Sequence, residues 1–284
     1  MWRQKIGVTV GKNYDIPKRE VVKLIGSAGF EGISPEWEND ETLKEIVAAA
    51  AESGLEIQSL HAPFTGSAKL WTWDETVSGP AREEILAAVD ACVNYHISVL
   101  VMHAWIGFDY AFVPEKLCFD AYDEIVRYAG EKGISIAFEN TEGHEFLFAL
   151  MERYAQRENV GFCWDSGHEM CYNYSMDLLG KYGDRLLVTH MNDNLGISRF
   201  DGRTFWTDDL HLLPYDGIAD WDHNIKRLKR AKKQDILNFE LARKSKPGRH
   251  DNDLYTQMTL ELYFAEAYKR ACKIACRYAE VWRE

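Results

Sequence analysis

The chain has 284 residues, of which 46% are hydrophobic and 27% are charged. This balance is typical of a globular protein with a large core and does not indicate disorder. The 45 acidic residues outnumber the 33 basic ones, and the resulting formal net charge of −12 disfavours a polynucleotide as the substrate.

The cysteines and the amino-terminal residues bear on the cellular compartment of the protein. Six cysteines occur without a Cys-x-x-Cys pair, which favours a reducing compartment. The first residues lead directly into a strand pattern, and no run of about 18 apolar residues follows. We therefore expect a cytoplasmic protein with no membrane segment. One domain over residues 1–284 is expected, because a barrel of alternating strands and helices needs about 250 residues.

Strand and helix patterns alternate along the whole chain. The expected strands cover residues 5–11, 31–37, 56–64, 98–105, 135–141, 160–165, 186–191 and 235–242. The expected helices cover 17–29, 42–53, 80–95, 114–132, a segment ending near 157, 176–182, 221–232 and 254–281. Pro80 and Pro114 stand where prolines that begin a helix would stand.

Eight alternating units predict an α/β fold, the (β/α)8 TIM barrel, with a long C-terminal helix. A doubly wound open sheet is the alternative. No GxGxxG follows the first strand and no GxxxxGK[ST] occurs, so the common nucleotide-binding forms of that alternative lack support.

Polar residues end most of the expected strands, and the active site of such a barrel forms at the carboxyl ends of its strands. Six of the eight strands finish with a group that can bind a metal: His61, His103, Glu139, Asp165, His190 and Glu240. Any one histidine is more often a satisfied core residue. A carboxylate at the end of a buried strand is costly unless a cation neutralises it, so the set as a whole predicts a metal site.

Glu139, Asp165, His190 and Glu240 would provide three carboxylates and one imidazole, which suits one Mn, Mg or similar ion better than a structural zinc. A second group lies nearby in the expected fold. Asp209 and His211 alternate in the polar segment after the seventh strand, and His168 follows the sixth. They could face the ion or a ligand together, although such a segment alone is more often a solvated loop.

The chain resembles the xylose isomerase-like TIM-barrel superfamily, which holds sugar phosphate isomerases/epimerases, ketose 3-epimerases, inosose dehydratases and endonuclease IV. The resemblance covers nearly the whole length. Its most specific parts are Phe138-Glu139-Asn140, Trp164-Asp165-Ser166-Gly167-His168, His190-Met191-Asn192-Asp193 and residues 209–221.

The resemblance implies a metal-dependent sugar isomerase or epimerase. Four ligands hold one Mn-like ion in the sugar epimerases, and the matching positions are Glu139, Asp165, His190 and Glu240. The two glutamates would also act as acid and base, through a cis-enediolate stabilised by the ion. His168 and Glu145 match contacts to substrate oxygens. The chain departs from the ketose epimerases at Gly196, where they carry an arginine; the nearest arginine is Arg199.

Endonuclease IV provides an alternative with three zinc ions, because all nine of its ligands have counterparts. These are His61, His103, Glu139, Asp165, His168, His190, Asp209, His211 and Glu240. The acidic charge and the lack of a basic loop for a phosphate backbone favour sugar chemistry. A lyase or dehydratase acting on a cyclic polyol is a further alternative, since the same enediolate could lose hydroxide.

The substrate is expected to be a small, unphosphorylated sugar, with no nucleic-acid partner and with a homo-oligomer left open. Besides His168 and Glu145, the residues expected to contact it are His61, His103, Trp105, Asp209 and His211. Seven aromatic residues fall at or near strand ends: Trp37, Phe64, Trp71, Trp73, Trp105, Trp164 and Trp206. If half of them line the mouth, the pocket is small, dry and uncharged.

Overall fold

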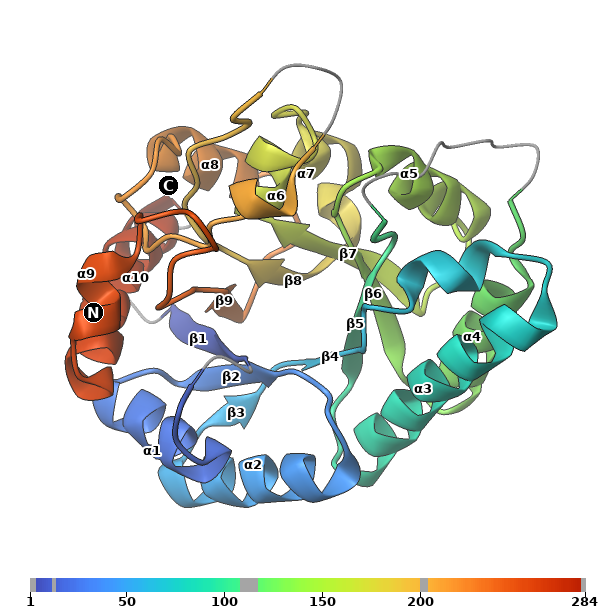
Figure 1. Ribbon diagram of the computed structural model, residues 1–284, viewed down its shortest axis with the longest axis horizontal. Coiled ribbons are helices and arrows are strands. Elements are labelled where there is room, and N and C mark those ends of the chain that lie inside the picture. The colour runs from blue at the N-terminus through green and yellow to red at the C-terminus, as the bar shows by residue number, and fades with distance from the viewer. Residues whose placement is uncertain (1–3, 12–13, 108–116, 200–203, 282–284) are drawn as a thin grey trace.

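The computed structural model describes residues 4–11, 14–107, 117–199 and 204–281, and it shows a ring of parallel strands surrounded by helices (Figure 1). The expected TIM barrel with a C-terminal helix is confirmed. Its strands are β1 (Lys5–Val10), β2 (Gly32–Pro35), β3 (Glu56–Ile57), β4 (Leu60–His61), β5 (Val99–His103), β6 (Ser135–Glu139), β7 (Val160–Asp165), β8 (Leu186–His190) and β9 (Ile236–Phe239).

The strands pair in two parallel runs, β3-β2-β1-β9 and β4-β5-β6-β7-β8. Two parallel bridges join these runs into a ring, one between Glu36 and His61 and the other between Met191 and Phe239. β3 and β4 together replace the single strand expected at 56–64, because β3 pairs with β2 and β4 pairs with β5. The nine labelled strands therefore fill eight positions of the barrel.

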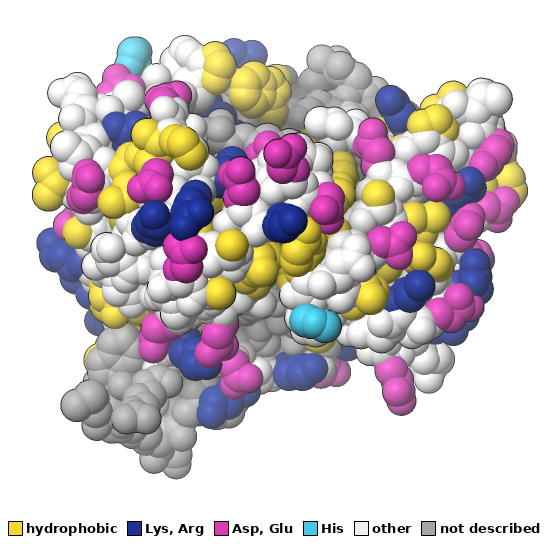
Figure 2. All heavy atoms as spheres, turned by 90° about the horizontal axis from the view of Figure 1, so that it is seen from below, with side chains coloured by type: hydrophobic (Ala, Val, Ile, Leu, Met, Phe, Trp, Pro, Cys, Tyr) yellow, Lys and Arg dark blue, Asp and Glu magenta, His cyan; other side chains and the backbone are white. Residues whose placement is uncertain are grey.

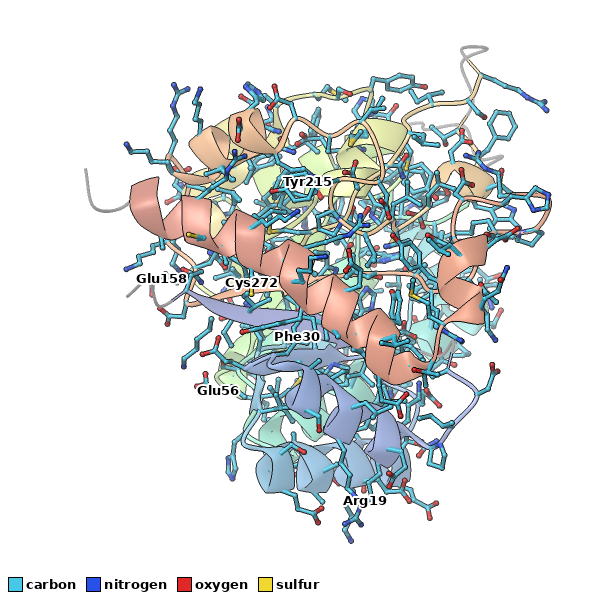
Figure 3. The ribbon with its side chains drawn as sticks, turned by 90° about the vertical axis from the view of Figure 1, so that its left-hand side faces the viewer. Arg19, Phe30, Glu56, Glu158, Tyr215 and Cys272 are labelled. Atoms are coloured by element: carbon cyan, nitrogen blue, oxygen red, sulfur yellow. The ribbon has the colours of Figure 1, made fainter. Side chains whose placement is uncertain are left out.

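The helices cover the outside of the ring (Figure 1). They are α1 (Lys18–Ala28), α2 (Asp40–Ser53), α3 (Glu75–Asn94), α4 (Asp120–Glu131), α5 (His144–Arg153), α6 (Ser166–Cys171), α7 (Leu178–Tyr182), α8 (Trp221–Leu228), α9 (Asp253–Gln257) and α10 (Leu260–Val281). α10 packs against α1, α8 and β1, and it crosses the side of the barrel close to Phe30 (Figure 3). The rings of Tyr268 and Phe30 meet edge to face, with centroids 5.2 Å apart.

The surface seen in Figure 2 carries acidic and basic side chains interspersed with one another. None of the helices within the described residues is long and apolar enough to cross a membrane.

Two expectations about helices, those for Pro80 and for residues 254–281, need correction, and the one for Pro114 is not tested. Pro80 does not begin α3, which starts at Glu75, because Asp74 caps this helix by accepting a hydrogen bond from the backbone N–H of Thr76 at 2.9 Å. Pro114 lies outside the described residues. The single helix expected at 254–281 is two helices, since Met258 between them is extended (φ −75°, ψ 155°).

The alternation of side chains along the strands explains why the polar strand ends converge. Side chains two positions apart on a strand face the same side. A small buried cluster, separate from the main core, contains Val101, Ala137, Cys163 and Val188. The residues two positions further along the same four strands are His103, Glu139, Asp165 and His190. The barrel interior therefore has an apolar layer, and the polar strand ends form the next layer above it.

Candidate metal centre

The carboxyl ends of the strands gather all nine predicted metal-binding residues. They form three groups, and within each group the possible ligand atoms lie within 4.8 Å of one another. The groups are His61, His103 and Glu139; Glu139, Asp165, His190 and Glu240; and His168, Asp209 and His211. The four-residue group, called the inner group below, has the composition that the sequence predicted for a single ion.

Glu139, at the end of β6, is the centre of this arrangement and is fully buried. Its Oε1 atom lies 3.1 Å from His190 Nδ1 and 3.4 Å from His168 Nδ1. Its Oε2 atom lies 3.2 Å from His61 Nε2 and 3.4 Å from His103 Nε2. Burial alone would raise the pKa of Glu139, but the imidazoles around it hold the pKa well below its usual value, so the group remains a carboxylate.

Glu240 follows β9 and approaches the same imidazole from another strand. Its Oε2 atom lies 2.7 Å from His190 Nδ1. Burial would raise the pKa of Glu240, and His190 lowers it to about 2. The pKa of His190 is raised well above normal, against the effect of burial, by the acidic groups around it. The carboxylates of Glu139 and Glu240 thus both lie close to the Nδ1 atom of His190.

Asp165 ends β7 and is the N-cap residue of the short helix α6, which follows directly. Its Oδ1 atom accepts a hydrogen bond from the backbone N–H of His168 at 2.6 Å, and its Oδ2 atom accepts one from Asn192 Nδ2 at 2.9 Å. Burial raises the pKa of Asp165 to about 6. A Cβ atom at Gly167 would lie 1.9 Å from Asn192 Oδ1, so a side chain there would displace the amide that binds Asp165.

His168, Asp209 and His211, called the outer group below, lie next to the inner group. Asp209 Oδ1 is 3.4 Å from His168 Nε2, and Asp209 Oδ2 is 2.9 Å from His211 Nε2. Burial would lower the pKa of His211, but Asp209 raises it to about 9. The structure thus places these three side chains close together, and that they face an ion or a ligand stays a prediction.

Asp193 arranges the long segment that carries the outer group. It is fully buried, and its carboxylate accepts hydrogen bonds from the backbone N–H groups of Tyr215 at 2.8 Å and Ala219 at 2.9 Å. It also accepts one from the indole of Trp221 at 3.1 Å, and its backbone pairs with Leu212. The sequence marked Asp193 as part of a motif but gave no sign of this role.

The donor set fits a divalent cation. Buried carboxylates are costly unless positive charge lies close to them. The nearby acidic groups raise the pKa values of His168, His190 and His211, which favours protonated imidazoles that balance the carboxylates. An ion bound by the inner group would release the proton of His190, which is the only histidine in that group. Cys163 also lies beside Glu139 and His190, but burial raises the pKa of its thiol to about 12, which disfavours a thiolate ligand.

A cavity of about 570 Å³ opens above these groups. Its lining includes six of the predicted residues: His61, His103, His168, Asp209, His211 and Glu240. Trp105 and Glu145 are not part of the lining; Trp105 instead stacks on Phe146 with ring centroids 4.1 Å apart. Glu142 and Tyr172 do line the cavity. The sequence reasoning missed both, although Glu142 lies only three residues beyond Glu139.

The expectation of an uncharged pocket is wrong. Residues 241–247, directly after β9, line one side of the cavity and bring Lys244 and Lys246 to it. Lys244 pairs with Asp15 at 2.9 Å, and Lys246 pairs with Asp209 at 3.4 Å. The basic residues Arg243, Lys244 and Lys246, which follow β9 in the sequence, could have indicated that the cavity is charged.

The aromatic residues divide between core and cavity. Phe64 and Trp206 line the cavity, whereas Trp71, Trp105 and Trp164 are buried. Trp73 is 69% exposed and lies outside the lining. Fewer aromatic residues than expected therefore reach the substrate space.

The departure at Gly196 has a backbone explanation. Its φ of +75° lies in the left-handed region, which favours glycine over arginine. The guanidinium of Arg199 lies 5.3 Å from the ring centroid of Phe205, and Arg199 is not among the residues lining the cavity.

A closed ring of parallel strands with polar donors at their carboxyl ends defines a TIM barrel of the kind that places its functional site at that end. The chain belongs to the xylose isomerase-like TIM barrel family, whose model matches residues 22–262. The resemblance inferred from the sequence motifs is therefore confirmed.

Among curated proteins, the uncharacterized protein y4fM of Sinorhizobium fredii is 29% identical over 272 residues, which cover 80% of this chain and 82% of that protein. Three solved structures share the fold. The zinc-bound IolI protein has a TM-score of 0.73 and 18% identity, over 95% of this chain and 98% of that one. D-psicose 3-epimerase from Clostridium cellulolyticum H10 has a TM-score of 0.68 and 12% identity, over 95% and 99%.

The third structure is a xylose isomerase-like TIM barrel/4-hydroxyphenylpyruvate dioxygenase fusion protein, with a TM-score of 0.70 and 16% identity. The match covers 94% of this chain but only 42% of the fusion protein. At these identities, the three structures establish the fold.

Proposed function

We propose that this protein is a divalent-metal-dependent isomerase or epimerase of an unphosphorylated sugar. The observation that carries the proposal is the meeting of Glu139 and Glu240 on His190, at 3.1 Å and 2.7 Å, directly beneath a cavity of about 570 Å³. Two carboxylates close to one bound carbon centre are what the removal and return of a proton require. The similarity in fold to IolI and to D-psicose 3-epimerase agrees with this chemistry.

The inner group, Glu139, Asp165, His190 and Glu240, would hold one ion of the Mn, Mg or Zn type. Such an ion would polarise the carbonyl of a bound sugar and so acidify the neighbouring C–H bond. Asn192 and the backbone N–H of His168 hold Asp165 in place for this role.

The protein's own groups would move the proton. The Glu240 side chain lines the cavity and is 21% exposed, so it is the proposed base. Glu139 lies behind it, between four imidazoles, and is the proposed second acid–base group. His61, His103, His168, Asp209 and His211 are the proposed partners of the substrate oxygens, with Glu142 added on the evidence of the cavity.

The basic residues of the cavity also bear on the substrate. Arg243 donates to the carbonyl groups of Thr256 at 2.8 Å and Met258 at 2.6 Å, and Lys244 and Lys246 have acidic partners. Because both lysines already pair with a carboxylate, we propose a neutral sugar rather than a sugar phosphate.

The test is hydrogen exchange from solvent into candidate ketoses. Wild-type protein loaded with Mn²⁺ is incubated with each sugar in D₂O, and NMR measures the deuterium incorporated at carbon. We expect incorporation in the wild type, a loss of at least about 100-fold in Glu240→Gln, and no change in Glu52→Gln, an exposed control. No incorporation with any sugar in the wild type would refute the proposal, and a product lighter by one water would assign the dehydratase alternative.

A second candidate is a phosphoesterase with three metal ions, and the geometry of the histidines favours it. The Nδ1 atoms of His61, His168 and His211 face backbone carbonyl oxygens at 2.8, 3.0 and 3.2 Å, which leaves each Nε2 atom directed at a carboxylate. This orientation is typical of metal-ligating histidine. Elemental analysis separates the candidates, because one ion per chain supports the isomerase, whereas three zinc ions with cleavage of abasic DNA support the phosphoesterase.

A further inference from the structure

We infer that the substrate carries a second ring, a glycosyl or aryl group, which stacks on Trp206 at the mouth of the cavity. The inference rests on the proposed function for the first ring and names the class of sugar: a keto-sugar with a ring substituent. Trp206 belongs to the short 3₁₀ turn Trp206–Asp208, just before Asp209 of the outer group.

The size of the cavity is the first observation. A hexose has twelve heavy atoms and fills at most about 360 Å³, even at the generous ~30 Å³ that one water molecule occupies in the liquid. The cavity of about 570 Å³ therefore has more room than a single hexose fills. The remaining space is large enough for much of a second ring.

The second observation is that two of the aromatic side chains lining the cavity, Phe64 and Trp206, have different surroundings. Phe64 packs in parallel on His103, with ring centroids 4.8 Å apart, and so belongs to the wall beside the inner group. Trp206 lines the same cavity but is 48% exposed. An exposed indole at the entrance of a sugar site offers a flat apolar face to a ring that extends outward.

Lys246 connects this indole to the site. Its ammonium lies 5.5 Å from the centroid of Trp206 and 3.4 Å from Asp209 Oδ2. A ring stacked on Trp206 would thus lie beside a hydrogen-bond donor and close to the outer group. Because Lys246 already has a carboxylate partner, the position suits a neutral ring with hydroxyl groups better than an anionic one.

Binding measurements test the inference without requiring turnover. Ligand-observed NMR titrations of the Mg²⁺-loaded protein would compare fructose with maltulose and isomaltulose, in which a glucose ring is joined to fructose. 4-Nitrophenyl glucoside tests the aryl arm. We expect at least one two-ring probe to bind about 3- to 10-fold more tightly than fructose, and Trp206→Ala to abolish that gain while fructose binding is unchanged.

Two further variants make the result specific. Trp206→Phe should keep part of the gain, because it keeps an aromatic face. Trp73→Ala should keep all of it, because Trp73 is exposed outside the cavity. The inference is overturned if no two-ring probe binds more tightly than fructose, if the gain survives in Trp206→Ala, or if that variant loses fructose binding equally. Absence of deuterium exchange would overturn the proposed function alone, since these titrations do not depend on catalysis.

Discussion

Asp193→Asn is the substitution for which the structure gives the most definite stability prediction. Each carboxylate oxygen of Asp193 accepts two hydrogen bonds: Oδ1 from the backbone N–H groups of Asn194 and Ala219, and Oδ2 from Tyr215 N–H and the Trp221 indole. An asparagine keeps one oxygen, and its NH₂ group must face two N–H donors in either orientation of the amide. Two donors lose their acceptor, at about 1–3 kcal/mol each, so we expect a loss of roughly 2–6 kcal/mol.

Urea denaturation followed by circular dichroism measures this loss, provided that the slope of the transition is unchanged. The matched control is Asp220→Asn, because Asp220 is exposed and caps α8 by accepting from His223 N–H at 2.9 Å, a role that asparagine performs equally well. The reasoning is refuted if Asp193→Asn loses less than about 1 kcal/mol, or if the control loses as much.

Three further predictions concern the surroundings of the site. Glu169→Ala should cost about 3–5 kcal/mol of unfolding free energy, because it leaves Arg227 with only the exposed Asp177 as an acidic partner and leaves the buried indole N–H of Trp164 without its acceptor. Glu52→Ala on the surface should cost less than about 1 kcal/mol, and similar losses for the two variants in urea melts would contradict the prediction. Gly167→Ala should lower both stability and metal content, since its Cβ would collide with Asn192, and a variant that keeps full metal content would show that the contact yields. Removal of metal by a chelator should lower the thermal midpoint, and the midpoint should return on adding Mn²⁺; an unchanged midpoint would indicate that the inner group holds no ion.

The fold could be predicted because its signals are local. Eight strand patterns alternated with helix patterns, and the 160–165 strand was placed correctly at both ends. The errors came where tertiary contacts outweigh local preference. Gln58 and Ser59 interrupt one strand so that its two halves can pair with different neighbours, and no local pattern marks that change.

The site was predictable to the extent that it follows the strand period. His103, Glu139, Asp165 and His190 end adjacent strands, so that any closed barrel brings them together. Cavity residues contributed by loops followed no such rule. Trp105 lies only two residues beyond β5, yet it turns away to stack on Phe146.

His168 connects the two possible functions at the level of a single side chain. Its Nδ1 atom lies 3.0 Å from the carbonyl oxygen of Asn140, and its Nε2 atom lies 3.4 Å from Asp209 Oδ1. If Nδ1 carries the hydrogen, then Nε2 is the atom that changes partner when the site is filled. With one ion in the inner group, Nε2 remains available to a substrate oxygen; with three ions, it becomes a ligand and its contact with Asp209 gives way to a shared metal. The two proposed functions therefore differ in what this imidazole would bind, and a count of bound ions distinguishes between them.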